Sequence, residues 1–491
     1  MTVGGLLVWL LPLVPVTTGL IMLLTRDRRV LAALDVGGAL VVLAMSVALA
    51  GQVGESGPVA AGPLRVDALA VPFLLLVGFL AVTTAIYTVG WMRGQLAHGG
   101  ITPGALRYYH ALVQGFIATM LVTILADNLG ILWIAMEGTT ITSAILVGFH
   151  GHGHGLEAAW KYIIVTTIGI SFGLFGTVLI YAAAAHAQGG VSTDAMSWAN
   201  VASISSSMDP GIVRIGFIFV LVGYGTKAGL APMHMWLPDA HSQAPTPVSA
   251  LLSGALLKCA LLGIIRFHTI AMGACGPELS SGLLILFGIV SVLVAAPFIL
   301  AQRDIKRLLG YSSVEHIGII ALALGFGGEL GTYAALLHVL NHGVTKALVF
   351  CVAGDAIGRY GSRDVNAIRG LLRVAPWAGT LLMVGTLALA GTPPSSVFIS
   401  ELLILRAGIG AGQLVVVALL LLAMLAIFAG LVHQAGRMAY GEPPAGVVRR
   451  SSPATMLAAM LLLTALILML GVFMPAGLDR MLTSAVEVVL G

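Results

Sequence analysis

The sequence predicts an all-α polytopic membrane protein with about fourteen transmembrane helices. Of its 491 residues, 58% are hydrophobic and only 9% are charged, and the mean hydropathy is +1.03. A soluble protein carries roughly 25% charged residues, so this composition excludes a soluble globular domain. Apolar runs of about 20 residues, the length that crosses a bilayer, recur from one end of the chain to the other.

The charge and cysteine content restrict the partners and cofactors. The net charge is +4, but the basic residues are dispersed through loops, so no nucleic-acid partner is indicated. Cys259, Cys275 and Cys351 stand singly and form no CxxC motif, which argues against an iron–sulfur cluster, a structural zinc site or a disulfide framework. The sequence therefore predicts no cofactor and no metal in this chain, and any redox chemistry would lie in a partner.

Apolar runs bounded by polar residues, glycine or proline define the candidate spans. The first run has no positive segment before it and is followed by Arg26, Arg28 and Arg29, so we expect a retained span and not a cleaved signal. The spans lie near residues 3–24, 30–51, 68–91, 106–126, 129–149, 160–182, 212–231, 248–269, 281–301, 308–327, 329–357, 374–408, 414–436 and 454–475.

The distribution of basic residues predicts the orientation of these spans. Of the 24 Lys and Arg residues, 16 fall in loops after odd-numbered spans, five lie in or beside even-numbered loops or near the C-terminus, and three lie inside spans. Cytoplasmic loops carry an excess of Lys and Arg. We therefore expect a multi-pass protein of the inner (plasma) membrane, with odd loops in the cytoplasm and both termini outside.

Two spans are broken by proline. Four prolines between residues 232 and 247 interrupt the apolar stretch 223–266, so one helix should end near Ala231 and another begin near Val248. Span 374–408 is interrupted at Gly391-Thr392-Pro393-Pro394 and is too long for one straight helix. Discontinuous helices that carry ionisable groups are typical of transport sites in membranes.

The two breaks divide the chain into two similar units. An N-terminal three-helix segment (1–105) precedes five helices in 106–269, five more in 281–439, and a C-terminal helix in 454–491. Each unit has its fourth helix broken, and because five is odd the second unit enters from the opposite face. The sequence thus predicts an inverted repeat with sites near the midplane.

Glu137 and Lys227 are candidates for a pair inside the membrane. Glu137 lies about eight residues into span five, and Lys227 lies near the end of span seven. Apart, each would lose its charge in hydrocarbon; together they hold each other charged. Making and breaking this pair would change the proton affinity of the next group, Lys258, halfway along span eight. The alternatives are a static ion pair that fixes helix packing and, for Lys258, a lysine that snorkels to the interface.

His338, His342 and Lys346 in span eleven are spaced by four, which places them on one helical face. A cation one turn beyond two histidines disfavours a divalent metal, and no HExxH motif is present. A polar stripe for water and protons is predicted, and a hydrogen-bonded packing stripe is the alternative. Histidine donates and accepts protons near neutral pH, which suits a relay.

The remaining ionisable residues follow the breaks or lie in loops. Glu401, after the second break, is predicted as the terminal proton donor or acceptor, with a helix-end carboxylate at the headgroups as the alternative. In the first break, Asp239 is as well explained as a cap on the next helix. A flexible, solvated loop explains the run HGHGH at 150–154 better than a metal site does. Further candidates are His234, His241, Glu315 and His316.

Three parts of the sequence together resemble a known family. They are KAGLAPMHMWLPDAHSQAPTPVSALLSGALLK (227–258), Glu137 of span five, and HVLNHGVTKALVF (338–350). The family comprises the antiporter-like subunits of respiratory complex I, of Mrp-type cation/proton antiporters and of membrane-bound nickel–iron hydrogenases, and the similarity covers roughly residues 70 to 440. Residues 156–181 and the stretch that begins NHGVTKALVFCVAGDAIGRYG are most similar to component F of hydrogenase-4 and its formate-hydrogenlyase relatives.

The resemblance implies discontinuous helices seven and twelve and a hydrated row of charged residues halfway across the membrane. Matched motif by motif, Glu137, Lys227 and Lys258 fall at the family's glutamate of span five and lysines of spans seven and eight. The span-eleven residues fall on the family's polar stripe, and Glu401 falls where the family places a lysine or a glutamate. With a glutamate at this position, the chain is similar to the middle subunits of complex I and to hydrogenase subunits. The distal subunit carries a lysine there and a long lateral helix after span fourteen, where this chain soon stops.

The expected function is that of a proton-translocating, non-catalytic subunit of a redox-driven complex. Its expected partners are other membrane-arm subunits and a peripheral module whose subunits carry iron–sulfur clusters and a nickel–iron or flavin centre. The alternatives are a Na⁺ or K⁺/H⁺ antiporter subunit of Mrp type, a non-conducting scaffold for a catalytic arm, and a module for inorganic-carbon uptake.

Overall fold

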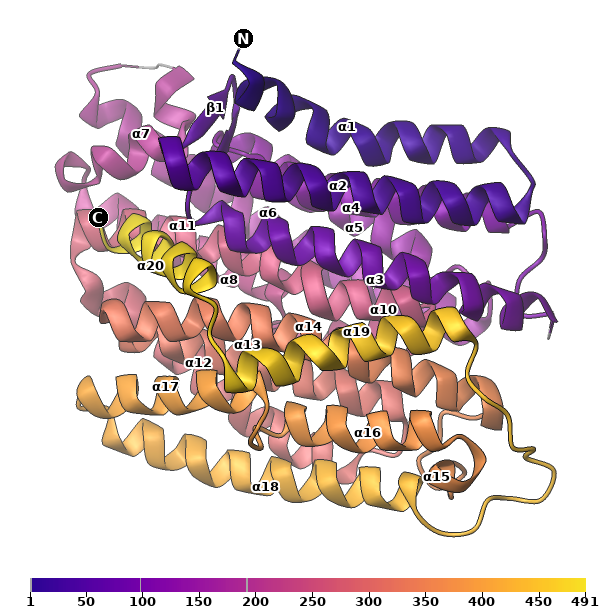
Figure 1. Cartoon of the computed structure of the whole chain (residues 1–491). Helices are drawn as coiled ribbons and strands as arrows, with labels where there is room; N and C mark the ends of the chain where they lie inside the picture. The colour runs from indigo at the N-terminus through magenta and orange to yellow at the C-terminus, as the bar shows by residue number, and fades with distance from the viewer. Residues whose placement is uncertain (1, 98, 191–192) are drawn as a thin grey trace.

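The computed structural model describes residues 2–97, 99–190 and 193–491. Its helices run side by side with roughly parallel axes, and both termini lie at the end of the bundle that carries β1 and α7 (Figure 1). The N-terminal segment contains α1 (Val3–Leu24), α2 (Arg28–Ser56) and α3 (Ala70–Ala97), with an antiparallel hairpin of β1 (Val59–Ala61) and β2 (Leu64–Val66) between α2 and α3.

The next part of the chain carries the first break. It contains α4 (Leu106–Leu125), α5 (Leu129–Val147), α6 (Gly153–Ala187), η1 (Thr193–Met196), α7 (Trp198–Ser203), η2 (Ser205–Ser207) and α8 (Pro210–Ala228). After the break come η3 (Met233–Met235), α9 (Trp236–Gln243), α10 (Thr246–Leu251), the π-helical turn η4 (Leu252–Leu256) and α11 (Leu257–Cys275).

The last part carries the second break. It contains α12 (Pro277–Ala301), α13 (Ile305–Phe326), α14 (Gly328–Tyr360), α15 (Leu371–Val374), α16 (Pro376–Leu389), α17 (Ser396–Gly410), α18 (Leu414–Ala439), α19 (Ala454–Val472) and α20 (Ala476–Leu490). The single C-terminal helix expected over 454–491 is two helices, because the chain is extended at Phe473 and again at Pro475, and α20 turns away from α19 (Figure 1).

The number of spans agrees with the prediction. Among the described residues, thirteen helices are long and apolar enough to cross a membrane. The fourteenth predicted span is the pair α16 and α17, which the second break divides. The predicted discontinuities in spans seven and twelve are thus present. The inversion of one five-helix unit relative to the other stays a prediction.

The first break is closed by specific hydrogen bonds. α8 ends at Ala228 because Gly229 adopts a left-handed conformation (φ 87°), which favours glycine, and its N–H returns to the carbonyls of Gly225 and Thr226. The Trp236 indole N–H also donates to the Thr226 carbonyl, at 2.8 Å. These bonds satisfy backbone groups that water would otherwise have to satisfy inside a membrane.

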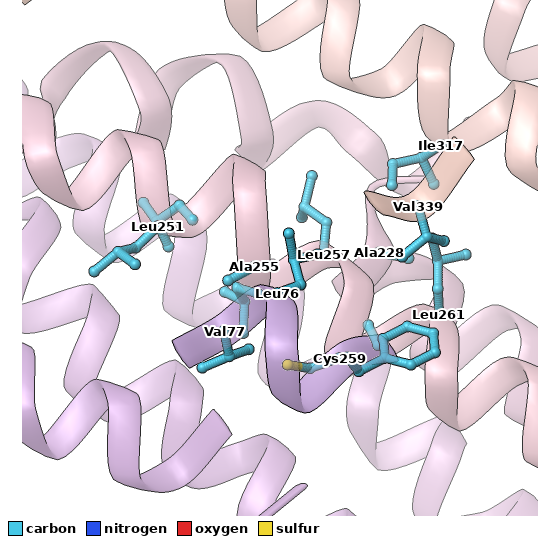
Figure 2. Close-up of a cluster of buried hydrophobic side chains, with 14 of the residues drawn as sticks. Leu76, Val77, Ala228, Leu251, Ala255, Leu257, Cys259, Leu261, Ile317 and Val339 are labelled. Atoms are coloured by element: carbon cyan, nitrogen blue, oxygen red, sulfur yellow. The ribbon is translucent and has the colours of Figure 1, made fainter. Parts of the chain in front are cut away.

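Three helical segments form the centre of the bundle. The most apolar windows of Thr246–Cys275, Ile305–Phe326 and Gly328–Tyr360 are wholly buried, whereas those of α1, α2 and α18 are 33% buried or less. Figure 2 shows apolar side chains from α3, α11, α13 and α14 packed together there, among them Leu76, Leu257, Ile317 and Val339. The predicted site residues of α11, α13 and α14 therefore lie in the most enclosed part of the protein.

Glycines allow α6 and α8 to approach closely. A Cβ built on Gly223 would overlap the backbone of Gly173, and one on Gly176 would overlap the backbone of Gly216. Small residues at helix contacts are how membrane helices bring their backbones together. This contact sets the spacing between α6 and Lys227 on α8.

We expect Gly223→Ala to lower the melting temperature of the detergent-purified protein, because overpacking a tight contact costs about 1–3 kcal/mol. The matched control is Gly51→Ala in α2, where an added Cβ meets nothing within 4 Å. An exposed helical Gly→Ala exchange is neutral or stabilising by roughly 0.5–1 kcal/mol. Equal melting temperatures for the two variants would contradict the close approach of α6 and α8.

Candidate functional site

Glu137 and Lys227 are linked through a hydroxyl and form no direct ion pair. The Lys227 ammonium is fully buried and donates to Thr140 Oγ1 and to the Tyr162 hydroxyl, each at 2.7 Å. Thr140 Oγ1 in turn donates to Glu137 Oε2 at 3.2 Å, and Thr167 donates to Oε1 at 2.9 Å. The two members of the predicted pair are thus bridged, because Thr140 lies one turn after Glu137 and places its hydroxyl between the two groups.

Lys258 meets the histidine stripe of α14. Its side chain is 1% exposed; Nζ donates to the Ser253 carbonyl at 2.5 Å and lies 3.0 Å from His342 Nδ1. Ser253 belongs to the π-helical turn η4, and such turns occur frequently at functional sites. Lys258 therefore does not snorkel to an interface.

Three histidines from two helices stack against one another. The ring centroid of His316 on α13 lies 4.5 Å from that of His342 and 5.2 Å from that of His338, with interplanar angles of 22° and 26°. His316 Nδ1 and His338 Nε2 are hydrogen-bonded at 3.0 Å. His316 was only a further candidate from the sequence, yet it joins both histidines of the predicted stripe.

Glu401 lies at the far end of this stack. It is 5% exposed, and its Oε1 lies 4.0 Å from His316 Nδ1, so it is not a headgroup-level carboxylate. A Cβ on Gly391, in the second break, would overlap the Glu401 carboxylate, which shows that glycine makes room for it. Its neighbour Ser400 bonds His338 Nδ1 through Oγ at 2.9 Å. The break thus positions two polar groups of α17 against the histidines.

The end of the stripe that Lys346 forms faces α13. The Lys346 ammonium is fully buried, donates to the Leu309 carbonyl at 2.8 Å and also donates to the Ser312 hydroxyl. Glu315, 4% exposed, interacts electrostatically with Lys346 and has no hydrogen-bond partner at Oε2. Lys346 is therefore held mainly by uncharged acceptors.

These contacts divide the polar residues into two separate groups. One is the Glu137–Lys227 group, and the other is the Lys258–Glu401 row, which includes the three stacked histidines. No hydrogen bond joins Lys227 to Lys258, although both residues lie in the described part of the chain. Their chain neighbours Ala228 and Leu257 belong to one apolar cluster, which Figure 2 shows. The expected transfer from Lys227 to Lys258 would have to cross this apolar cluster.

The candidates in the first break are divided between the surface and the interior. Asp239 does not cap the next helix, because α10 begins after Pro245. Its carboxylate instead pairs with Arg307 (3.1 Å) and Lys161 (3.6 Å), beside a pocket of about 580 Å³. His241 is fully buried with both ring nitrogens unpartnered, and His234 is 8% exposed with Nδ1 unpartnered. The two histidines, unlike Asp239, thus point into the protein.

One cluster has donors suited to a metal. Single ligand atoms of His316, His338 and Glu401 all lie within 4.8 Å of one another, and the three residues are buried. The two histidines are already hydrogen-bonded to each other, between His316 Nδ1 and His338 Nε2. The arrangement is therefore interpreted as a relay of hydrogen-bonding groups and not as a metal centre.

Several polar residues of the bundle were missed from the sequence. Thr140, Tyr162 and Ser400 complete the hydrogen bonds of the predicted residues but are uncharged, so nothing marks them. Asp35 on α2 is 3% exposed and accepts from His110 (2.9 Å) and Gln114 (2.8 Å) of α4. A carboxylate inside span 30–51 was a signal that could have found this second buried network.

The run HGHGH is partly buried at its first histidine. His150 is half-buried, and its ring centroid lies 6.5 Å from that of Trp91 in an edge-on arrangement, while His152 and His154 are exposed. The run is therefore exposed to solvent at His152 and His154 but not at His150, and its flexibility stays a prediction.

Comparison with known proteins places this geometry in a family. Residues 126–427 match the family described as "NADH:quinone oxidoreductase/Mrp antiporter, TM". A hydrogenase-4 component F homolog of Methylacidiphilum infernorum is 40% identical over 379 residues, which cover 77% of this chain and 79% of that protein. Hydrogenase-4 component B of Escherichia coli is 30% identical over 427 residues, and the chain spans 61% of its length.

A solved structure agrees over nearly the whole chain. A chain of the membrane-bound sulfane sulfur reductase, an archaeal respiratory membrane complex, superposes with a TM-score of 0.88 at 25% identity, and covers 98% of this chain and 97% of its own length. The match 126–427 includes every residue from Glu137 to Glu401 described above. The chain is therefore a multi-pass integral membrane protein that belongs to the NADH:quinone oxidoreductase/Mrp antiporter transmembrane family.

Proposed function

We propose that this chain translocates protons as an antiporter-like subunit of a redox-driven membrane complex of hydrogenase-4, formate-hydrogenlyase or complex I type. The observation that carries the proposal is the continuous row from Lys258 through His342 to His316, which in turn lies next to both His338 and Glu401. Neighbouring groups in this row stack or approach within 4.0 Å. Each member can hold and release a proton. Intramembrane ionisable groups of this kind are functional by default, because burying them has a high free-energy cost.

The proposed proton transfer begins at Lys227. Thr140 accepts a hydrogen bond from Lys227 and donates one to Glu137, so a change of charge near Glu137 alters how well the ammonium is stabilised. Redox events in a partner would supply that change. The released proton would cross the apolar cluster beside Ala228 and Leu257 when water enters it, and reach Lys258.

The second half of the transfer uses the histidines. Lys258 is within hydrogen-bonding distance of His342 Nδ1, and the 3.0 Å bond between His316 and His338 provides a direct step between rings. Buried polar atoms are normally satisfied by protein or by ordered water. His342 Nε2, His316 Nε2 and Glu315 Oε2 have no protein partner, which supports water along the row. Glu401 would release the proton.

Two polar places lie at the side of the bundle, which supports partners there. Glu137 is partly exposed on α5 beside the exposed Ile134 and Ile141, and Pro393 and Pro394 are exposed at the second break. Irregular backbone and carboxylates are not stable against lipid tails. Other membrane-arm subunits would cover both places. A peripheral module with iron–sulfur clusters and a nickel–iron or flavin centre would drive the complex.

The proposed placement is the inner (plasma) membrane with both termini outside, supported by the excess of basic residues in odd loops. The five-helix units 106–269 and 281–439 are proposed to be inverted repeats, each supplying one part of the polar system, and the presence of a break in both supports this.

Lys227→Ala in the assembled complex should abolish redox-linked acidification, because the removed ammonium is the proton carrier of the first group. The measurement is fluorescence quenching of a pH dye in inverted vesicles with matched amounts of complex. The control is Lys161→Gln, an exposed lysine whose ammonium pairs with Glu157 at 2.6 Å. Unchanged pumping in the assembled Lys227→Ala complex would favour the scaffold alternative.

Thr140→Val should slow proton translocation, and Thr140→Ser should restore it. Valine keeps the shape of threonine but removes the hydroxyl that links Lys227 to Glu137. A hydrogen bond to a charged group contributes about 1.5–3 kcal/mol, which corresponds to a change of roughly 10- to 100-fold in rate or equilibrium. Equal rates for the Val and Ser variants would show that the bridge has no part in transfer.

A Na⁺ or K⁺/H⁺ antiporter is the second candidate, supported by the family match that includes Mrp antiporters. In vesicles without a redox substrate, we expect addition of Na⁺ or K⁺ to the complex to produce no pH gradient. A cation-driven gradient that disappears in Lys258→Gln would instead assign antiport to this chain.

A further inference from the structure

A pocket of about 260 Å³ lies at the end of the bundle opposite the termini. It forms where the loop between α5 and α6 meets the ends of α3, α9 and α14 and the start of α13. Four of its lining residues are basic: His150, His152, Lys306 and Arg363. None of the described residues that line it is an aspartate or a glutamate, and polar groups such as Thr246 and Ser362 complete the wall.

The Lys306 amine and the Arg363 guanidinium of the pocket are held in place. Lys306 is 3% exposed, and its ammonium donates to the Ala244 carbonyl at 2.5 Å, which leaves further N–H groups of the three available. Arg363 donates to the Ser242 carbonyl at 2.8 Å, and its Nε lies 3.7 Å from Asp304. Asp304 lines the neighbouring pocket and interacts with both cations, so one carboxylate faces two positive groups.

Both burial and basic neighbours disfavour the protonated form of His150. Its pKa is lowered to about 4, first by burial and then by the positive charges of Lys306, His152 and Arg363. A ligand that carried negative charge would reverse that electrostatic effect. The pocket therefore combines a shaped cavity with basic side chains from three separate parts of the chain.

We propose that this pocket binds an anion of phosphate chemistry, either inorganic phosphate or the phosphate of an anionic phospholipid headgroup. A guanidinium and an ammonium are the groups that proteins use to bind phosphate oxygens. Basic pockets at the cytoplasmic ends of membrane helices are suited to anionic lipids. The bound anion joins the α5–α6 loop to α13 and to the chain that follows α14, and so holds the α9–α10 break closed at its surface end. This site is independent of the proton row.

The first experiment measures binding to the full-length, detergent-purified chain in phosphate-free buffer. Calorimetric titration with inorganic phosphate is expected to show binding, and Arg363→Gln and His152→Gln are each expected to weaken it by tenfold or more, which is about 1.4 kcal/mol. Arg449→Gln, an exposed arginine in the loop between α18 and α19, should leave binding unchanged. Phosphate should also raise the pKa of His150, followed by NMR of ¹⁵N-labelled histidine.

The second experiment separates the two sources of phosphate. The chain is placed in nanodiscs of phosphatidylcholine alone or with phosphatidylglycerol, and lipid retention is followed by native mass spectrometry. Retention of phosphatidylglycerol that depends on Arg363 identifies a headgroup, and titration with inorganic phosphate alone identifies a free anion. The proposal is overturned if neither ligand binds, or if Arg363→Gln, His152→Gln and Arg449→Gln bind alike. Because His152 is exposed, its variant keeps the test valid if Arg363→Gln fails to fold.

Discussion

The need to replace water around a buried ammonium group determines the structure of this protein. Lys227, Lys258 and Lys346 are each at most 1% exposed, and each is held mainly by uncharged acceptors. Lys227 meets two hydroxyls, Lys258 a carbonyl and an imidazole, and Lys346 a carbonyl and a hydroxyl. Since no carboxylate contacts these lysines directly, more distant charges decide how firmly each keeps its proton.

The helix breaks provide acceptors and space that continuous helices cannot. A regular helix uses its own carbonyls, whereas a break or a π-turn leaves some free for side chains. The Ser253 carbonyl serves Lys258, and Gly391 leaves room for the Glu401 carboxylate. The same breaks place irregular backbone within the spans, which is stable only where protein or water covers it. Conduction and assembly with neighbouring subunits therefore depend on the same backbone features.

Long apolar runs and the charges inside them made much of this protein predictable. Proline and glycine marked both breaks, and four-residue spacing put His338, His342 and Lys346 on one face of α14. The sequence did not show that Thr140 would stand between Glu137 and Lys227. The sequence did not indicate the central position of His316. The residue pattern of one helix does not show which side chain of another helix a histidine will contact.

The sequence by itself determined the membrane class, the spans, the two discontinuities and the ionisable residues inside them, because hydropathy and proline act locally along the chain. Only the tertiary structure decided which helices are neighbours. Close glycine contacts between α6 and α8 bring Tyr162 to Lys227, and packing of α13 against α14 brings His316 to His338. The basic pocket is likewise made from three distant segments, which no local pattern joins. These contacts depend on side-chain volumes summed over the whole bundle.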